Sequence, residues 1–373
     1  MKKEKIKILF MIHDLGGGGA ERVLNNLVNN LNPDSFDITI LALFNVGNYQ
    51  HDLNNNIKYK YVWNKPFPKN TSILKLFPKE KLHNMIVKDT YDIEVAYLEG
   101  SVHRIVAGCC NPDTRLLAWQ HSYPHEVDDA MIGFRNYEEA SACYEKYNGI
   151  ACVSNEINDA MHKYYPSLNN LSVVHNVNDT DKIVELAKEP IDERLDGSAI
   201  KICCVGKLVK LKRVDRIIKV TRQLLDSGHN VQTLIIGTGP EEQLLKDSCV
   251  SYGITDKVIF TGFQTNPYKY ISKCDIFVCA SESEGFSTAT TEALVLGLAV
   301  VSTPVSGARE LLGDNEFGIV SEMTIESIYK CVESLVSNSQ LLQDKRNAST
   351  KRGEMFLINK SILENETWIK SRL

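Results

Sequence analysis

The stretch that most constrains this chain is a strand-like run, a polar turn and a helical run between residues 275 and 302. Residues 275–279 and 299–302 are apolar runs of the kind that form strands buried on both faces of a sheet. The turn between them carries Glu284 beside Gly285, and the helix carries Glu292. Ligands of open α/β proteins bind at this edge of a parallel sheet, where a strand gives way to a helix. We therefore expect a ligand site here.

These two carboxylates admit a second interpretation. Glu284 and Glu292 are eight residues apart, slightly over two helical turns, which places both on one side of the helix start. The N–H groups at such a start attract an anion. The plain alternative is a solvated glutamate followed by a glutamate favoured by the helix dipole. The pair alone does not decide between the two.

Composition excludes several classes of protein. A length of 373 residues predicts about two domains, and 43% hydrophobic residues is ordinary for a globular protein. The net charge of −5 argues against bulk binding of nucleic acid. The first apolar run is too short for a signal peptide or a membrane span, so we expect a cytoplasmic protein. The ten cysteines form no C-x-x-C pair, and we expect reduced core residues, not metal ligands or disulfides.

A glycine-rich loop follows the first predicted strand, residues 7–12. Gly16 to Gly19 precede a helical pattern, and four glycines let the backbone approach a ligand and aim N–H groups at an anion. The loop lacks the Gly-Lys-Ser/Thr of a phosphate-binding Walker loop. It also lacks the last glycine of G-x-G-x-x-G, since Glu21 stands there. A merely flexible loop is the alternative.

Eight lysines lie between Lys58 and Lys88, interleaved with aromatic residues, and only Glu80 offsets them. Lysines with aromatics suit an anionic membrane surface, where each lysine contributes about 1 kcal/mol. A solvated irregular surface explains the pattern equally well, and nucleic acid is a poorer third interpretation. The first interpretation predicts a peripheral contact of residues 58–88 with the inner face of a membrane.

The remaining strand signals of the first half predict one doubly wound α/β unit. They are residues 37–43, 91–97, 115–119, 149–153 and 171–174. The strand ending at Trp119 brings His121 to its carboxyl edge, which makes His121 a site candidate, although a loop histidine without a role is the alternative. A polar passage from His175 to Gly197 is a plausible linker.

A second α/β pattern follows, with strand-like runs at residues 200–205, 233–236 and 257–260. Their ends converge on glycine-rich or charged turns. Lys207 and Lys212, in the first of these turns, suit a diphosphate as point charges, although lysines at the start of a surface helix are common. The tail from residue 325 onward is helical in pattern, and its last part could pack back across the other domain.

Taken in order, these motifs resemble the GT4 family of retaining glycosyltransferases, which have the GT-B fold. The resemblance rests on residues 205–212, 237–240, 284–293 and 303–310, together with residues 17–22, 119–121 and 153–154 in the first half. It implies two facing Rossmann-like α/β domains. Residues 1–176, completed by a C-terminal helix at 357–373, would form the acceptor domain, and residues 177–356 the nucleotide-sugar donor domain.

The resemblance also implies roles for single residues. Lys207 and Lys212 would bind the donor diphosphate, Glu292 the ribose and Glu284 the transferred sugar, while His121 would face the reacting sugar. Further donor contacts are implied for Gly17, Gly18, Gly206, Gly237, Gly239, Phe263, Gly285, Phe286, Ser287 and Thr288. Asn176 would mark the hinge.

The chemistry agrees with these roles, because lysines and helix N–H groups stabilise a departing diphosphate electrostatically. We expect no metal and no cofactor, since no Asp-x-Asp pair is present. Two departures from the family pattern stand out. Lys207 replaces a common arginine, exchanging a bidentate fork for a point charge. Arg213 stands where glycine is frequent, so we expect a tighter loop there.

Three functions remain to be compared. The leading hypothesis is a retaining transferase that moves a sugar from a UDP-linked donor to a glycan acceptor, lipid-linked, in cell-surface polysaccharide or glycoconjugate assembly. The second is a non-catalytic GT-B subunit that stabilises a partner glycosyltransferase. Such subunits tend to lose the charged donor residues that this chain retains. The third is a nucleotide-sugar epimerase, which needs further acid and base residues that the sequence does not reveal.

Overall fold

The computed structural model describes residues 4–47, 49–191 and 195–373. Within them the chain divides into two compact units. Unit 1 comprises Met1–Val177 and Ser361–Leu373, and unit 2 comprises Asn178–Lys360. Both are built on parallel sheets, so the predicted pair of α/β domains is confirmed.

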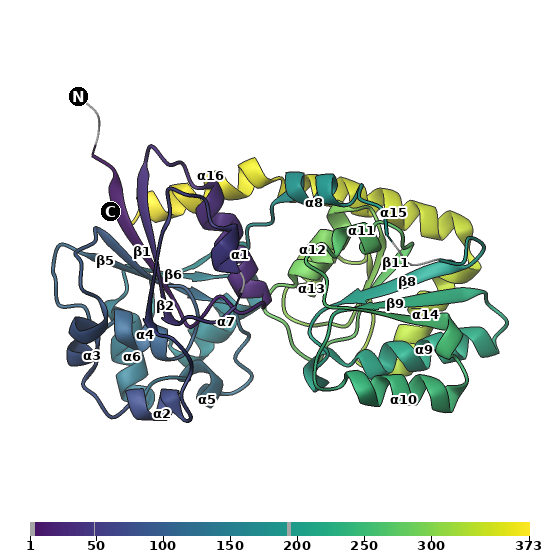
Figure 1. Ribbon diagram of the computed structural model, residues 1–373, viewed down its shortest axis with the longest axis horizontal. Coiled ribbons are helices and arrows are strands. Elements are labelled where there is room, and N and C mark those ends of the chain that lie inside the picture. The colour runs from purple at the N-terminus through teal and green to yellow at the C-terminus, as the bar shows by residue number, and fades with distance from the viewer. Residues whose placement is uncertain (1–3, 48, 192–194) are drawn as a thin grey trace. The chain divides into compact units, whose positions relative to one another are not determined.

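Unit 1 contains a seven-stranded parallel sheet in the described residues, in the order β3-β2-β1-β4-β5-β6-β7. Helix α1 lies on one face of this sheet, and α3, α4 and α6 lie on the other (Figure 1). The strands are β1 (Ile6–Ile12), β2 (Phe36–Phe44), β3 (Lys58–Trp63), β4 (Ile93–Ala96), β5 (Arg115–Gln120), β6 (Gly149–Cys152) and β7 (Leu171–Val173). The helices are α1 (Gly19–Asn30), η1 (Tyr49–Asp52), α2 (Asn70–Leu74), α3 (Lys79–Ile86), α4 (Ser101–Val106), α5 (Val127–Ala130), α6 (Tyr137–Lys146) and α7 (Asn155–Tyr164).

Unit 2 contains a six-stranded parallel sheet in the described residues, in the order β10-β9-β8-β11-β12-β13. Helices α9 and α10 cover one face, and α11 and α12 cover the other (Figure 1). The strands are β8 (Ile200–Val205), β9 (Val231–Ile236), β10 (Val258–Gly262), β11 (Ile276–Cys279), β12 (Ala299–Ser302) and β13 (Ile319–Val320). The helices are α8 (Thr180–Leu186), η2 (Lys210–Lys212), α9 (Val214–Asp226), α10 (Glu242–Tyr252), η3 (Thr255–Lys257), α11 (Tyr268–Ile271), α12 (Thr288–Val295), α13 (Ala308–Leu312), α14 (Ile325–Ser337), α15 (Ser339–Gly353) and η4 (Glu354–Phe356).

The central strands form the core because their sequences are continuous apolar runs. Residues Ile8 to Ile12 of β1 are fully buried, as are Val231, Leu234 and Ile235 of β9. Such runs bury both faces of a strand between two layers of helices. The edge strand β3 differs, because its alternating lysines and tyrosines leave it half exposed. This strand was not among the predicted ones, since Lys58–Trp63 carries no apolar run.

The last helix, α16 (Ile358–Lys370), crosses the boundary between the units. Its later residues belong to the core of unit 1: the Trp368 ring packs edge-on against Trp119 at 4.8 Å, and Glu366 accepts a hydrogen bond from the Asn32 amide at 2.7 Å. Its start belongs to unit 2, because the Ile358 amide donates to Thr180 Oγ1 at 3.0 Å. The predicted return of the C-terminal helix to the first domain is confirmed. The division falls after residue 360, whereas the predicted tail begins at 357.

The passage predicted as a linker, 175–197, is not wholly irregular. It contains α8, whose end is bound to unit 2 because Asn266 Nδ2 donates to the Leu186 carbonyl at 2.9 Å and Ser272 Oγ to the Ala187 carbonyl at 3.0 Å. Residues 192–194 of that passage lie outside the described residues. The helical tail from residue 325 is confirmed by α14, α15 and α16.

Candidate active site

The sheet of unit 2 has a switch point between β8 and β11. From β8 the chain adds β9 and β10 on one side, and from β11 it adds β12 and β13 on the other. The loops that leave two such strands diverge, which opens a crevice at their carboxyl ends. The loop after β8 carries Lys207 and Lys212, and the loop after β11 carries Glu284. The two strongest motifs of the sequence therefore meet at this point of the sheet.

Lys212 and Glu284 form an ion pair there. The Lys212 Nζ atom lies 2.6 Å from Glu284 Oε1 and 2.7 Å from Oε2, and the Glu284 side chain is only 14% exposed. Ser281 Oγ donates a further hydrogen bond to Oε1 at 2.7 Å. The backbone joins the same two loops, because the Glu282 amide donates to the Leu211 carbonyl at 2.9 Å. Lys207 differs, since its side chain is exposed and has no hydrogen-bond partner among the described residues.

Two glycines let the neighbouring β9 loop approach the lysine turn. A Cβ atom at Gly237 would lie 2.0 Å from the Gly206 carbonyl oxygen, and one at Gly239 would lie 2.3 Å from the Leu208 carbonyl oxygen. Contacts this short would force the backbone apart, so both positions require glycine. These predicted residues therefore shape the turn that carries Lys207 and Lys212.

Arg213 closes the lysine turn in a left-handed conformation, with φ of 47° and ψ of 42°. Glycine adopts this conformation without steric strain. This explains why glycine is frequent at this position in the family that the chain resembles. The guanidinium of Arg213 pairs with Asp215 at 2.9 Å and also with Glu282. The hydrogen bonds that Arg213 donates to both carboxylates raise its pKa, so its charge is permanent. The ion pairs offset the backbone cost at this position.

Helix α12 begins at the Glu284 loop. Ser287 is its N-cap, and the Ser287 hydroxyl accepts a hydrogen bond from the Thr290 amide at 3.2 Å. Thr288 is the first helical residue. Phe286 is 5% exposed and lies against Phe356, with ring centroids 6.4 Å apart. The side chains of Phe286 and Ser287 are thus engaged in the fold, which leaves the amides at this helix start as the groups suited to an anion.

Glu292 is deeply buried in α12, at 2% exposure. Its Oε1 atom accepts a hydrogen bond from the Tyr268 hydroxyl at 3.1 Å. Tyr268 lies at the start of α11, so this bond joins two helices on the same face of the sheet. Phe263 does not lie on a strand next to the switch point. It follows β10, and β9 lies between β10 and β8. Its side chain is 57% exposed.

Unit 1 has its own switch point, between β1 and β4. Gly17 and Gly18 follow β1 in an exposed loop, and Gly18 is the N-cap of α1. This turn is acidic: Asp14 Oδ1 accepts from the Gly16 amide at 2.8 Å, and Glu21 stands in the first turn of α1. Burial raises the pKa of the Glu21 carboxyl, with partial offset by its own amide.

His121 lies in the loop after β5 and is 8% exposed. Its ring packs against Tyr97 at 4.8 Å, and its Nε2 atom is buried without a hydrogen-bond partner among the described residues. Burial lowers the pKa of His121 to about 3, so the imidazole is neutral near pH 7. A neutral imidazole with one uncommitted nitrogen can accept or donate a hydrogen bond, depending on its tautomer.

Glu99 was missed in the sequence. It follows β4, and its Oε1 atom accepts hydrogen bonds from the backbone amides of His121 and of Ser122, the latter at 2.6 Å. Burial raises the pKa of Glu99 to about 7, although those amides favour its charged form. A signal was present, because Glu99-Gly100 after a strand matches Glu284-Gly285 in the other half. Ser281 and Tyr268, which donate hydrogen bonds to Glu284 and Glu292, were also missed, and no sequence motif marks them.

Comparisons with known proteins show what this chain resembles. The family model described as "Glycosyl transferases group 1" matches residues 187–353, which covers most of unit 2. The chain is 26% identical over 377 residues to a Campylobacter jejuni N-acetylgalactosaminyltransferase that acts on a diphospho-undecaprenol-linked substrate, with 94% of this chain and 95% of that protein covered. It is also 26% identical over 369 residues to an uncharacterized glycosyltransferase of Haemophilus influenzae, covering 96% of this chain and 98% of that one.

The crystal structure of HepE from Anabaena in complex with UDP and glucose superposes with a TM-score of 0.79 at 16% identity, covering 98% of this chain and 100% of HepE. The two parallel-sheet units and this superposition together show the GT-B fold. Residues 187–353 of the chain match the glycosyl transferases group 1 family, as the motifs of the second unit predict.

Proposed function

We propose that unit 2 binds a nucleotide-sugar donor, and that the Lys212–Glu284 pair at its switch point is the centre of that site. The observation that carries this proposal is the ion pair itself, with Nζ 2.6 Å from Oε1, between the β8 and β11 loops. A lysine that faces a diphosphate and a glutamate that faces sugar hydroxyls are the two ends of one donor molecule. The ion pair holds both in place before the donor arrives, which is preorganisation of the kind that electrostatic catalysis requires.

The reaction we propose follows from these groups. The transferred sugar leaves its diphosphate, whose growing negative charge is stabilised by Lys207, Lys212 and the amides at the start of α12. Glu292, held by Tyr268, binds the ribose hydroxyls. We propose the GT4-like, retaining course, in which the leaving phosphate takes the acceptor proton on the same face of the sugar. Lysines replace a divalent metal in this scheme, so transfer proceeds without added magnesium or manganese.

The donor we propose is a UDP-sugar and the acceptor a lipid-linked glycan. The structure of HepE contains UDP and glucose, which supports the choice of nucleotide. The Campylobacter jejuni relative acts on a sugar chain attached to diphospho-undecaprenol, which supports the choice of acceptor. None of the helices in the described residues is long and apolar enough to cross a membrane. We therefore propose that unit 1 meets such an acceptor at the surface of the inner leaflet, from the cytoplasm.

The surface that we propose for this contact is the turn after α2, not the whole interleaved stretch from Lys58 to Lys88. Lys58 and Lys60 are paired with Asp37 and Asp89, and Trp63 and Phe67 pack on Phe44. These residues are therefore committed to the fold. By contrast, the turn after α2 exposes apolar side chains beside lysines, since Leu76 is 77% and Phe77 37% exposed.

Two arginines hold this turn in place. Arg104 donates to the carbonyls of Leu74 and Phe77 at 3.2 and 2.7 Å, and Arg135 donates to the carbonyls of Lys75 and Phe77 at 2.6 and 2.8 Å. The apolar tip is thus fixed outward, with Lys75 in the turn. An apolar tip flanked by lysines is suited to an anionic lipid surface.

A turnover experiment tests the proposed function. The protein is incubated with a panel of nucleotide-sugars, each with and without a lipid-linked glycan acceptor, and product and free nucleotide are measured. We expect acceptor-dependent release of UDP. Conversion of the donor sugar without transfer would instead identify an epimerase. Absence of any turnover, with a partner glycosyltransferase activated on addition of this chain, would identify a non-catalytic subunit.

Membrane contact is tested separately with vesicles containing anionic lipid. We expect Leu76→Asp to reduce co-sedimentation about tenfold or more, because burial of a leucine contributes about 1.5–3 kcal/mol. The matched control is Leu244→Asp, which changes a leucine that is 61% exposed on α10 of unit 2. Equal binding of wild type and both variants, or no binding at all, would contradict the membrane contact while leaving the proposed transfer intact.

A further inference from the structure

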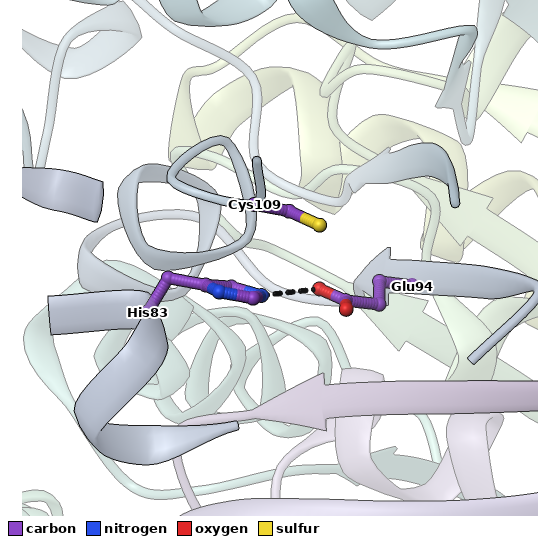
Figure 2. A group of neighbouring side chains, drawn as sticks. All are labelled: His83, Glu94 and Cys109. Carbon is purple, nitrogen blue, oxygen red and sulfur yellow. Dashed lines mark hydrogen bonds and ion pairs between the residues drawn. The ribbon is translucent and has the colours of Figure 1, made fainter. Parts of the chain in front are cut away.

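Three side chains of metal-ligand type gather inside unit 1. His83 lies on α3, Glu94 on β4, and Cys109 in the turn after α4. All three are buried, with exposed fractions of 6%, 2% and 3%. Figure 2 shows the imidazole and the carboxylate in line, with the Cys109 sulfur directed toward the space beside their hydrogen bond. The three residues are far apart in the sequence and form no short metal-binding motif, so the sequence did not predict this cluster.

The distances suit a single ion. One ligand atom from each residue lies within 4.8 Å of the other two, and His83 Nε2 is 2.8 Å from Glu94 Oε2. Around zinc, nitrogen, oxygen and sulfur ligands stand about 2.0–2.3 Å from the metal, so in a tetrahedral arrangement they stand roughly 3.3–3.7 Å apart. The 2.8 Å hydrogen bond is shorter than that spacing, so the His83 and Glu94 side chains would have to separate to admit the ion.

Glu94 lies where a carboxylate needs a positively charged partner, which is the His83 imidazolium unless a metal ion replaces it. Glu94 pairs in register with Leu9 of β1 and Leu116 of β5, in the middle of the sheet. A carboxylate at such a position is costly unless opposite charge accompanies it. With a thiolate at Cys109 and a neutral imidazole at His83, a divalent ion makes the whole cluster neutral.

The imidazole is already oriented for this role. His83 Nδ1 lies 3.4 Å from Asn84 Oδ1, while Nε2 is directed at Glu94. A histidine that ligates a metal through one nitrogen commonly donates its other N–H to an oxygen, which fixes the tautomer. Burial alone would lower the pKa of His83, but hydrogen bonds with Cys109 and Glu94 outweigh it and raise the pKa to about 10. Without a metal the cluster is therefore an ion pair beside a thiol.

The cluster is remote from the candidate active site of the same unit. Glu94 is near the start of β4, five residues before Glu99 at the carboxyl edge. An ion here would join α3, β4 and the turn after α4, none of which carries His121.

We propose that His83, Glu94 and Cys109 form a structural zinc site in unit 1. A soft thiolate together with imidazole and carboxylate favours zinc over magnesium or calcium, which prefer oxygen ligands alone. Three protein ligands leave the fourth position of the tetrahedron for a water molecule. The site concerns the stability of unit 1 and does not depend on the proposed transfer reaction.

The first test measures metal in the unaltered protein. Untagged full-length chain, purified without chelator, is analysed by elemental mass spectrometry, and a portion is stripped and dialysed against zinc. We expect about one zinc per chain in one or both samples. A zinc content below about 0.1 per chain in both would overturn the proposal. Replacement by cobalt should add a near-ultraviolet absorption from a thiolate ligand.

The second test uses variants. Cys109→Ser and His83→Gln should each lower the zinc content at least tenfold and abolish the rise in Tm that zinc gives the stripped protein. The matched control is Cys143→Ser, which removes another buried thiol of unit 1, on α6, and should retain the zinc. A Cys109→Ser protein that binds zinc as well as wild type would show that the cluster is only a hydrogen-bonded ion pair. If the variants fail to fold, the metal content of the wild type decides alone.

Discussion

The switch points of the two units have the same layout and opposite charge. In each sheet a turn-to-helix loop leaves one central strand and a Glu-Gly pair leaves the next, Glu99-Gly100 after β4 and Glu284-Gly285 after β11. In unit 2 the first loop supplies lysines, and Lys212 neutralises Glu284 at 2.6 Å. In unit 1 the first loop supplies Asp14, which lies 2.7 Å from His13 Nδ1, and Glu21. No cation within the described residues is paired with Glu99, which accepts hydrogen bonds from amides.

This difference teaches which ligand each unit suits. A site that collects lysines beside one glutamate stabilises phosphate charge and still offers a carboxylate to sugar hydroxyls. A site that collects carboxylates repels phosphate and offers hydrogen-bond acceptors to neutral hydroxyl groups. The same sheet topology therefore serves opposite ends of the proposed reaction, and the side chains of two loops decide which end. Fold alone would not have distinguished them.

The largest effect on activity should come from removing Lys212, the lysine that pairs with Glu284 at the switch point of unit 2. We expect Lys212→Ala to reduce donor-dependent release of nucleotide about 10²–10³-fold, the usual consequence of losing one charge-stabilising donor at a reacting centre. Steady-state kinetics with the best donor of the panel measures this.

The matched control is Lys210→Ala, because Lys210 is an exposed lysine of the same short helix, η2. It should retain activity within a few-fold. Urea unfolding of both variants separates lost catalysis from lost stability. Activity of Lys212→Ala within threefold of wild type would remove Lys212 from the site and with it the contrast between the units.

A smaller effect, on the pH dependence of stability, should come from Glu99 at the switch point of unit 1. The folded pKa of Glu99, about 7, lies above the unfolded value of 4.5, so the folded chain holds this proton more tightly. Between these two values the folded state binds more protons, and its free energy of unfolding therefore falls as pH rises, then levels off above pH 7. The fall should amount to about 1–3 kcal/mol, with allowance for the partial exposure of this side chain.

Glu99→Gln tests this because glutamine does not titrate. We expect the variant to gain on the wild type in stability between pH 5 and pH 7, in urea unfolding at a series of pH values. Two curves that stay parallel over that range would show that Glu99 is as well solvated as in the unfolded chain, and the acidic switch point of unit 1 would then not be a desolvated site.

The sequence predicts the fold wherever burial is continuous. Eleven of the strands described here coincide with apolar runs that the sequence already displays, because a strand covered on both faces cannot be polar. The edge strand β3 alternates lysine with tyrosine, and β13 has only two residues, so neither carries that pattern. Their existence depends on pairing with β2 and β12, which is tertiary information.

The sequence predicts which residues belong to the candidate site, but not which of them contact one another. Lys212 and Glu284 stand out as motifs, yet their ion pair depends on how two loops, far apart in the chain, meet across neighbouring strands. His83, Glu94 and Cys109 show the opposite case. Each is unremarkable in the sequence, and only the packing of α3 and α4 on the sheet brings them together. Glu99 was within reach, since it repeats the Glu-Gly signal of the second unit.

The smallest effect concerns how each unit makes its first turn. Both first turns contain a glycine at positive φ, Gly17 and Gly206, but unit 2 adds Arg213 at φ of 47° and holds it with Asp215 and Glu282. The left-handed conformation destabilises the fold by about 1 kcal/mol at a non-glycine residue, and exposed ion pairs stabilise it by about the same amount. Arg213→Gly should therefore change the free energy of unfolding by less than about 1 kcal/mol. Arg213→Ala loses the pairs and keeps the backbone cost, so it should be less stable than the glycine variant by about 1 kcal/mol. Equal stability of the two in urea would mean that the turn relaxes out of the left-handed region once the arginine is gone.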